Sequence, residues 1–300
     1  MAGKQENKYL KNRGKVTSYL GLNKGIDLTD FPTSFALAAS IVIAVVTVIV
    51  NAFFGVAFED GAYLGLILAS TYFFTWLLAN ELDPGRRVGG LIGGFIALAM
   101  YFVLGSGNPI VLLWLMFIVR MFNRTTGSGP QMGDNVIIIF MAYYLSRGGF
   151  WLYPVVTGLA YAADSQLKRG SFRNLYLAAL CFGITAISSD NLATTINLNL
   201  TYVILMGVTV VLFLPAISMA TYVKGRDERN NFDLDSRRIQ AGQAAFLFGS
   251  ILISWFSGNS QAVSFAPAWA GAIGIGLYLF YIAVQNSRNK SKDDKIESKK

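Results

Sequence analysis

The chain has 300 residues, of which 54% are hydrophobic and 14% charged, with a formal net charge of +8 and a mean hydropathy of +0.47. This composition excludes an ordinary soluble domain and is typical of an integral membrane protein. The chain contains no histidine, which argues against histidine-ligated haem, most zinc and non-haem iron sites, and Ser-His or Cys-His nucleophiles, so we expect no metal ion and no cofactor.

The first predicted segment, residues 1–31, is basic. It contains several lysines and one arginine but lacks the short apolar core and the small-residue cleavage site of a secretory signal. We therefore expect this N-terminal segment to stay in the cytoplasm.

Residues 32–285 are predicted to form an all-α bundle of about ten transmembrane helices. Several apolar runs have the length of roughly 17 to 25 residues that a helix needs to cross about 30 Å of hydrocarbon. Strand-like alternation is lacking, and unpaired backbone groups are costly in lipid, so helices are expected rather than a barrel. The predicted spans lie near 34–55, 62–79, 88–105, 109–123, 132–146, 149–164, 172–188, 200–222, 242–257 and 265–285. Residues 286–300 are predicted to be a disordered cytoplasmic tail.

Basic residues fall in alternate loops between these spans. The opposite loops hold almost nothing basic except Arg147, and this asymmetry predicts that both termini face the cytoplasm. Because the basic residues are spread over loops and tails rather than gathered on one face, no nucleic-acid partner is expected. The short apolar segments within 134–163 leave a full hairpin and a re-entrant pair of half-helices open. The loops of the basic side contain Arg86, Arg87, Arg124, Lys168, Arg169, Arg173, Lys224, Arg226, Arg229, Arg237 and Arg238.

Three predicted spans share a pattern in which a basic pair precedes, and a polar turn with asparagine follows, the apolar run. The separation is 22 residues in each case: Arg86 to Asn108, Arg169 to Asn191 and Arg237 to Asn259. Internal duplication, which is common in transporters, and a length set only by the bilayer both explain this spacing. Two glycine-rich stretches, 89–94 and 271–276, carry small residues four apart and predict close helix packing.

A glycine-rich turn centred on Gly127 separates two charged residues that lie inside apolar runs. Arg120 and Asp134 stand seven residues before and after it, so in a hairpin they reach similar depth, with Arg120 about 18 Å along its helix. Because an isolated charge in a membrane is costly, we predict an Arg120–Asp134 pair lining a polar pocket that opens to the cytoplasm. The predicted substrate-binding residues are Arg120, Asp134, Asn135 and Asp164, with Gln131 beside them.

A second interpretation of the same residues stays open. In it, Arg120 extends to the lipid headgroups, and Asp134 caps a helix beginning at Asn135, where a carboxylate is favoured by the helix dipole.

These features favour a transporter or permease for a small solute, because many short-looped helices and a few semi-buried polar groups suit alternating access. The expected partners are the lipid bilayer and a small solute that the sequence does not identify. A bacterial or archaeal cytoplasmic membrane fits such compact loops. A non-catalytic component of a membrane complex is an alternative function.

Asn80-Glu81-Leu82-Asp83 and Asp164 resemble, in position, the aspartate-rich cytoplasmic loops that intramembrane prenyltransferases carry after their second and sixth spans. That family holds Mg²⁺-diphosphate with several aspartates about four apart. Here each loop offers one aspartate, with Glu81 in addition in the first, beside two or more basic residues. Basic loops can still hold a phosphate headgroup, so an intramembrane enzyme acting on lipid or isoprenoid substrates is an alternative to transport.

Overall fold

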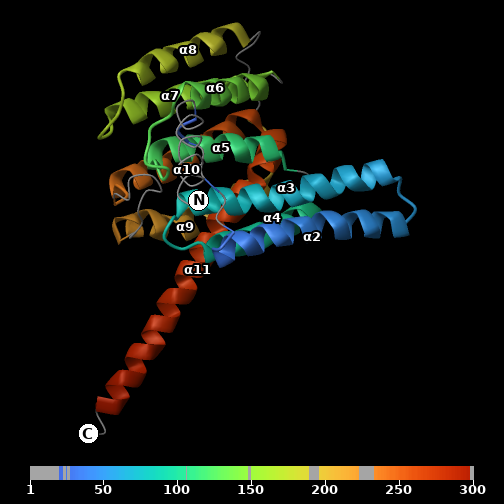
Figure 1. Ribbon diagram of the computed structural model, residues 1–300, viewed down its shortest axis with the longest axis vertical. Helices are drawn as coiled ribbons and strands as arrows, with labels where there is room; N and C mark the ends of the chain where they lie inside the picture. The colour runs from blue at the N-terminus through green and yellow to red at the C-terminus, as the bar shows by residue number, and fades with distance from the viewer. Residues whose placement is uncertain are drawn as a thin grey trace, which may run out of the picture.

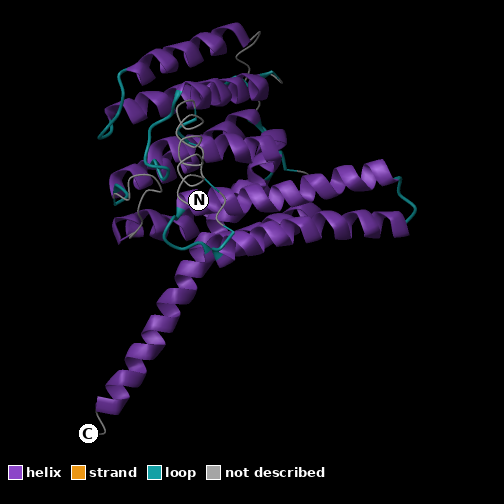
Figure 2. Cartoon of the chain, in the orientation of Figure 1, coloured by secondary structure: helices purple, strands orange, loops and turns teal. Residues whose placement is uncertain are grey.

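The computed structural model describes residues 20–22, 25, 28–105, 107–147, 150–188, 196–222 and 233–297 (Figure 1). These residues are 82% helical and contain no strand, which confirms the all-α class (Figure 2). Most of the predicted basic segment 1–31 lies outside them. The α-helices are α2 (Phe31–Phe53), α3 (Phe58–Leu82), α4 (Val88–Leu104), α5 (Pro109–Asn123), α6 (Met132–Ser146), α7 (Leu152–Gln166), α8 (Arg173–Ser188), α9 (Leu200–Met219), α10 (Ser236–Ser257) and α11 (Asn259–Glu297), with a 3₁₀ turn η1 (Ala220–Tyr222) after α9.

Five of these helical segments are long and apolar enough to cross a membrane, which indicates an integral membrane protein. They are α2, α3, α9 continued through η1, α10 and the part of α11 up to Asn289. The other helices have 15 to 17 residues, and a 15-residue helix extends only about 22 Å. Ten transmembrane helices are therefore not confirmed, because hydropathy alone does not separate a short buried helix from a full crossing.

Most consecutive helices pack against each other and alternate in direction, so the loops gather at two ends of the bundle, but within the described residues α4 does not contact α5 and α8 does not contact α9 (Figure 1). The α2–α3 hairpin projects beyond its neighbours, and α7 packs against α8 at the opposite edge. The helix α11 packs against α4 and α9, and its C-terminal part leaves the bundle (Figure 1). This up-and-down arrangement brings loops that are far apart in sequence to the same end.

The region 134–163 forms two separate helices, α6 and α7, which pack against each other. The spans that share the basic-to-asparagine pattern correspond to α4, α8 and α10, of 17, 16 and 22 residues. These lengths differ, and internal duplication stays a hypothesis.

The tail was expected to be disordered from residue 286, and this expectation is wrong as far as Glu297, where α11 ends. The physical reason is that extending a helix that already exists adds one hydrogen bond per residue without the cost of nucleation.

The two glycine-rich stretches pack against each other, which confirms the prediction that they form a packing seam. A Cβ added at Gly93 of α4 would lie 2.7 Å from the Cα atom of Gly271 in α11, and one at Gly89 would lie 2.9 Å from the Cα atom of Ile275. Contact between two backbones at this distance leaves no room for a side chain. In lipid, where hydrophobic burial does not drive helices together, such close packing stabilises the pair.

We expect Gly93→Ala to destabilise the protein by about 1 to 3 kcal/mol, because the methyl group forces α4 and α11 apart. The measurement is thermal or denaturant unfolding of the purified protein in detergent. Gly183→Ala in α8 and Gly207→Ala in α9 are matched controls, since a Cβ at either position meets nothing within 4 Å. These controls should gain about 0.5 to 1 kcal/mol from reduced backbone entropy. Equal stability of Gly93→Ala and the controls would contradict the seam.

Candidate functional site

Arg120 lies in the last turn of α5 and is buried against α3. Its Nη2 and Nε atoms lie 2.9 Å and 3.0 Å from Glu81 Oε1, and its Nη1 donates to the carbonyl of Leu22 at 3.2 Å. The predicted Arg120–Asp134 ion pair is therefore wrong. The packing of α5 against α3 places the last turns of these helices together, and Glu81 belongs to the last turn of α3.

Asp134 is the third residue of α6, and it caps that helix. Its Oδ2 atom accepts from the backbone N–H of Gln131 at 2.8 Å, of Gly21 at 2.6 Å and of Leu22 at 3.1 Å. With Gln131 as N-cap this forms a capping box. The capping interpretation of Asp134 is thus confirmed, although α6 begins at Met132 rather than at Asn135.

Arg120 and Asp134 nevertheless meet through one residue, because both bind the backbone of Leu22, whose side chain is fully buried. The loop between them binds the same segment: Thr126 Oγ1 and Ser128 Oγ each donate to the carbonyl of Gly21 at 2.8 Å. We call this set the loop clamp. It consists of Glu81, Arg120, Thr125, Thr126, Ser128, Asp134 and the backbone of Gly21 and Leu22, with Thr125 Oγ1 donating to Glu81 Oε2 at 2.7 Å.

Asn135, the next residue of α6, joins two helices. Its Oδ1 atom accepts a hydrogen bond of 2.9 Å from the hydroxyl of Tyr161 in α7, and both side chains are buried. Asn135 therefore holds α7 against α6.

Asp164, at the end of α7, is fully buried and accepts from three other segments of the chain. Its Oδ1 atom lies 2.7 Å from Arg238 Nη1, and its Oδ2 atom lies 2.7 Å from Asn174 Nδ2 and 3.3 Å from Arg124 Nη2. Arg238 also donates to the carbonyls of Phe122 and Lys168, at 2.9 Å and 2.8 Å. One carboxylate therefore fixes two guanidinium groups and the ends of α5, α7, α8 and α10.

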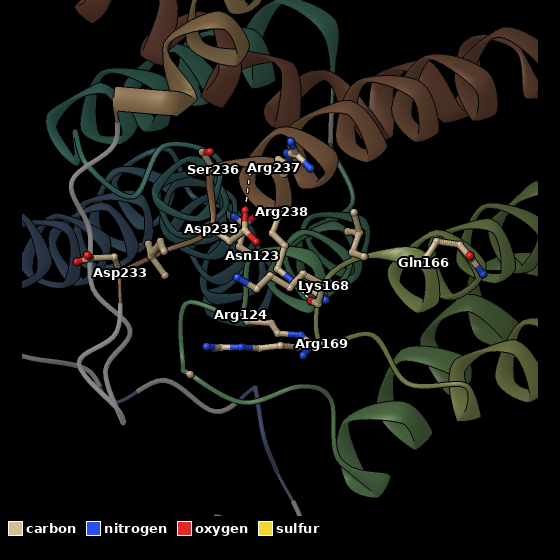
Figure 3. A pocket seen from close by; sticks show the side chains of 13 residues that line it. Asn123, Arg124, Gln166, Lys168, Arg169, Asp233, Asp235, Ser236, Arg237 and Arg238 are labelled. Atoms are coloured by element: carbon tan, nitrogen blue, oxygen red, sulfur yellow. Dashed lines mark hydrogen bonds between the residues drawn. The ribbon is translucent and has the colours of Figure 1, made fainter.

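A pocket of about 510 Å³ opens beside this buried cluster (Figure 3). Five of its lining residues are basic and two are acidic. Figure 3 shows the side chains of Arg124, Lys168, Arg169 and Arg238 lying close together, whereas that of Arg237 points away from them. We call this the basic pocket. It is lined by Asn123, Arg124, Gly127, Gln166, Leu167, Lys168, Arg169, Asp233, Leu234, Asp235, Ser236, Arg237 and Arg238.

Two arginines of the basic pocket have an unusual backbone. Arg124 has a φ of 51° and Arg169 a φ of 63°, and no other non-glycine residue in the described ranges has a positive φ. Arg124 caps the C-terminus of α5, and Arg169 is the third residue of a turn closed by a 2.7 Å hydrogen bond from Gly170 N to Leu167 O. The left-handed conformation costs an ordinary residue about 1 to 2 kcal/mol, and glycine or asparagine usually occupies such positions. Strain of this kind is concentrated at functional sites.

Basic side chains outnumber acidic ones in the lining of the basic pocket. Within the described part of the chain, three of its buried atoms have no hydrogen-bond partner: the donors Arg124 Nε and Arg238 Nη2 and the acceptor Asn123 Oδ1. Burial lowers the pKa of the Arg124 guanidinium, the Asp164 carboxylate opposes this shift, and Arg238 and Arg169 add to it. Arginine stays charged at neutral pH. An anion in the pocket would lie among five basic and two acidic side chains.

The four predicted site residues thus fall into two groups. Arg120, Asp134 and Asn135 belong to packed contacts of the loop clamp and the α6–α7 pair, whereas Asp164 lies behind the basic pocket. Sequence reasoning missed Glu81 as the partner of Arg120, and it treated the basic loops as signals of topology alone. Asp164 was expected to share a pocket, and the arginines that it binds do line one. In the part of the chain that the structure describes, no three His, Cys, Asp or Glu side chains are placed to hold a metal ion.

Fold and pocket together define a helical integral membrane protein with a strongly basic pocket at one end of its bundle. No protein-family model, curated protein or solved structure matches the chain.

Proposed function

We propose that this chain is a membrane transporter for a small anionic solute and that the basic pocket is the site where the solute enters the bundle. The observation that carries the proposal is the lining of the pocket by five basic residues, two of which, Arg124 and Arg238, each have a buried N–H group without a partner in the described part of the chain. Buried N–H groups without a partner are costly, and charge-assisted hydrogen bonds to an anion are among the strongest that a protein makes.

In this proposal Arg124 and Arg238 bind the anion, and Lys168 and Arg169 attract it into the pocket. Asp164 is a positioning residue, because it holds both guanidinium groups in place without facing the solute. A planar guanidinium fixed by one carboxylate keeps its remaining N–H groups aimed in constant directions.

Arg120, Asp134 and Asn135 are positioning residues of a second kind. The loop clamp fixes the segment 124–131, and the first residue of that segment carries its guanidinium to the pocket. Asn135 fixes α6 against α7, whose C-terminal end leads to Lys168 and Arg169. In this proposal Arg120, Asp134 and Asn135 do not contact the solute as predicted; they hold in place the basic residues that do.

The proposed orientation follows from the basic residues. By the positive-inside rule we propose that the basic pocket and both termini face the cytoplasm. We propose further that the membrane is the cytoplasmic membrane of a bacterium or archaeon.

The test is flux into proteoliposomes. Inorganic phosphate, pyrophosphate and citrate, each radiolabelled, serve as solutes, and uptake is compared with that of protein-free liposomes. We expect uptake of at least one of them by the wild-type protein and a loss of tenfold or more in Arg124→Gln/Lys168→Gln. Arg147→Gln removes one charge outside the pocket and should leave flux unchanged. No uptake of any of the three above the protein-free rate would contradict the proposal.

An enzyme acting on a lipid diphosphate is the second candidate, because Asp233 and Asp235 bring two carboxylates to the wall of the same pocket. Carboxylates beside cations suit Mg²⁺-diphosphate. Mg²⁺-dependent release of diphosphate from farnesyl diphosphate by the purified protein would establish this activity in place of transport. A component of a membrane complex would instead co-purify with a partner in fixed proportion.

A further inference from the structure

An apolar groove of about 320 Å³ runs between α7 and α10. Five of the nine residues that line it are alanines, and their small side chains leave the space between the two helices open. The rim consists of Leu159 and Phe248, which are 42% and 57% exposed, so the groove opens to the outside of the bundle. On a membrane protein this surface faces lipid.

The groove ends where the basic pocket begins. In α7 it reaches Ala163, and Gln166 and Leu167 then line the pocket. In α10 it reaches Ala241, and the pocket takes over at Arg238. On both helices the change from apolar to basic lining therefore happens within about one helical turn, or about 5 Å. The end of α5 repeats this change, because Phe122 lines the groove and its neighbour Asn123 lines the pocket.

Along α10, the basic pocket and the apolar groove follow each other in the same order as the headgroup and the chain of a lipid. The helix α10 is a candidate membrane span, and the pocket includes its first residues, whereas the groove follows its next turns from Ala241 to Phe248. A lipid has its charged headgroup at the membrane surface and its chain in the hydrocarbon. Basic pockets between helices at the membrane surface are a known kind of site for phosphate headgroups.

From this arrangement we propose that the anion bound in the basic pocket is the headgroup of a phosphate-bearing lipid, whose chain lies in the groove between α7 and α10. This proposal rests on the anion-binding part of the proposed function, and it makes the bound anion part of a lipid rather than a small free solute. The phosphate lies beside the guanidinium groups of Arg124 and Arg238, and the alanine-lined groove holds the first carbons of the chain. A free anion would use only the pocket and leave the groove without a role.

The experiment measures binding of two probes to the full-length protein in detergent micelles. Native mass spectrometry gives the affinity for phosphatidic acid, with phosphatidylcholine as the lipid of no net charge. Calorimetric titration gives the affinity for pyrophosphate, which has no chain. Ala244→Phe and Ala163→Phe fill the groove from its two walls, and Arg124→Gln/Lys168→Gln weakens the pocket. Ala179→Phe is the matched control, because Ala179 is an exposed alanine of α8, away from the groove.

We expect each groove variant to weaken phosphatidic acid binding tenfold or more while pyrophosphate binding stays within twofold of the wild type. The pocket variant should weaken both probes tenfold or more, and Ala179→Phe should change neither. Unfolding midpoints of all variants identify any that fail to fold.

Three outcomes overturn the lipid proposal. If pyrophosphate binds but the groove variants bind phosphatidic acid as the control does, the ligand is a free anion and the proposed transport function stands. If phosphatidylcholine binds as tightly as phosphatidic acid, the pocket does not select a headgroup with a net negative charge. If neither phosphatidic acid nor pyrophosphate binds, the lipid proposal and the proposed anion site fall together.

Discussion

Asp164→Ala is expected to destabilise the protein by about 3 to 5 kcal/mol, because it leaves the buried guanidinium of Arg238 and the part-buried guanidinium of Arg124 without the carboxylate that holds them. Arg238 is only 3% exposed, so water does not replace the lost charge. The loss should be measured by unfolding in detergent. Asp60→Ala is the matched control, since Asp60 is exposed in the first turn of α3, and its loss should cost less than about 1 kcal/mol.

A compensating change gives this prediction a second test. Replacing Arg238 by methionine in the Asp164→Ala background removes one of the buried cations, and it should recover at least about 1 kcal/mol of the lost stability. Asp164→Ala should also weaken pyrophosphate binding, because Arg124 and Arg238 lose their fixed orientation. If Asp164→Ala were as stable as Asp60→Ala, Asp164 would not be the anchor of the basic pocket.

The fold class could be predicted from the sequence because long apolar runs indicate helices that are surrounded by lipid rather than by water. The packing of 89–94 against 271–276 was only half predictable. Small residues four apart predict that a helix packs closely against another, but only the fold shows that Gly93 contacts Gly271 of α11. The number of membrane crossings could not be predicted from hydropathy. A 15-residue apolar helix such as α5 is buried among other helices, and its sequence is as apolar as that of a helix in contact with lipid.

The contacts of the candidate site were harder to predict because their partners are distant in sequence. Arg120 and Glu81 are 39 residues apart, and Asp164 and Arg238 are 74 apart. Symmetry about Gly127 favoured Asp134 as a partner, but that carboxylate accepts from the backbone N–H of Gln131 at the start of its own helix and from that of Gly21 in the N-terminal segment. A local capping rule therefore identified the role of Asp134 more accurately than the depth argument did.

Arg120→Leu is expected to cost about 3 to 5 kcal/mol, because it leaves the Glu81 carboxylate buried without the charge of Arg120. The same substitution at Arg147, which is exposed, should cost less than about 1 kcal/mol and is the control. Two double variants distinguish the possible partners of Arg120. Adding Glu81→Gln to Arg120→Leu should restore part of the lost stability, because the remaining buried group is then neutral.

Adding Asp134→Asn should restore nothing, and it should cost a further amount of about 1 kcal/mol through the weakened cap of α6. Residues that interact directly show coupling energies of about 0.5 to 3 kcal/mol in such cycles, whereas distant or independent residues are additive. Coupling of Arg120 to Glu81 that clearly exceeds its coupling to Asp134, with which Arg120 shares only the backbone of Leu22, would make the loop clamp a structural support for Arg124. The reverse result would return Arg120 and Asp134 to a shared polar pocket, and it would move the candidate site from the end of the bundle to the interior between α5 and α6.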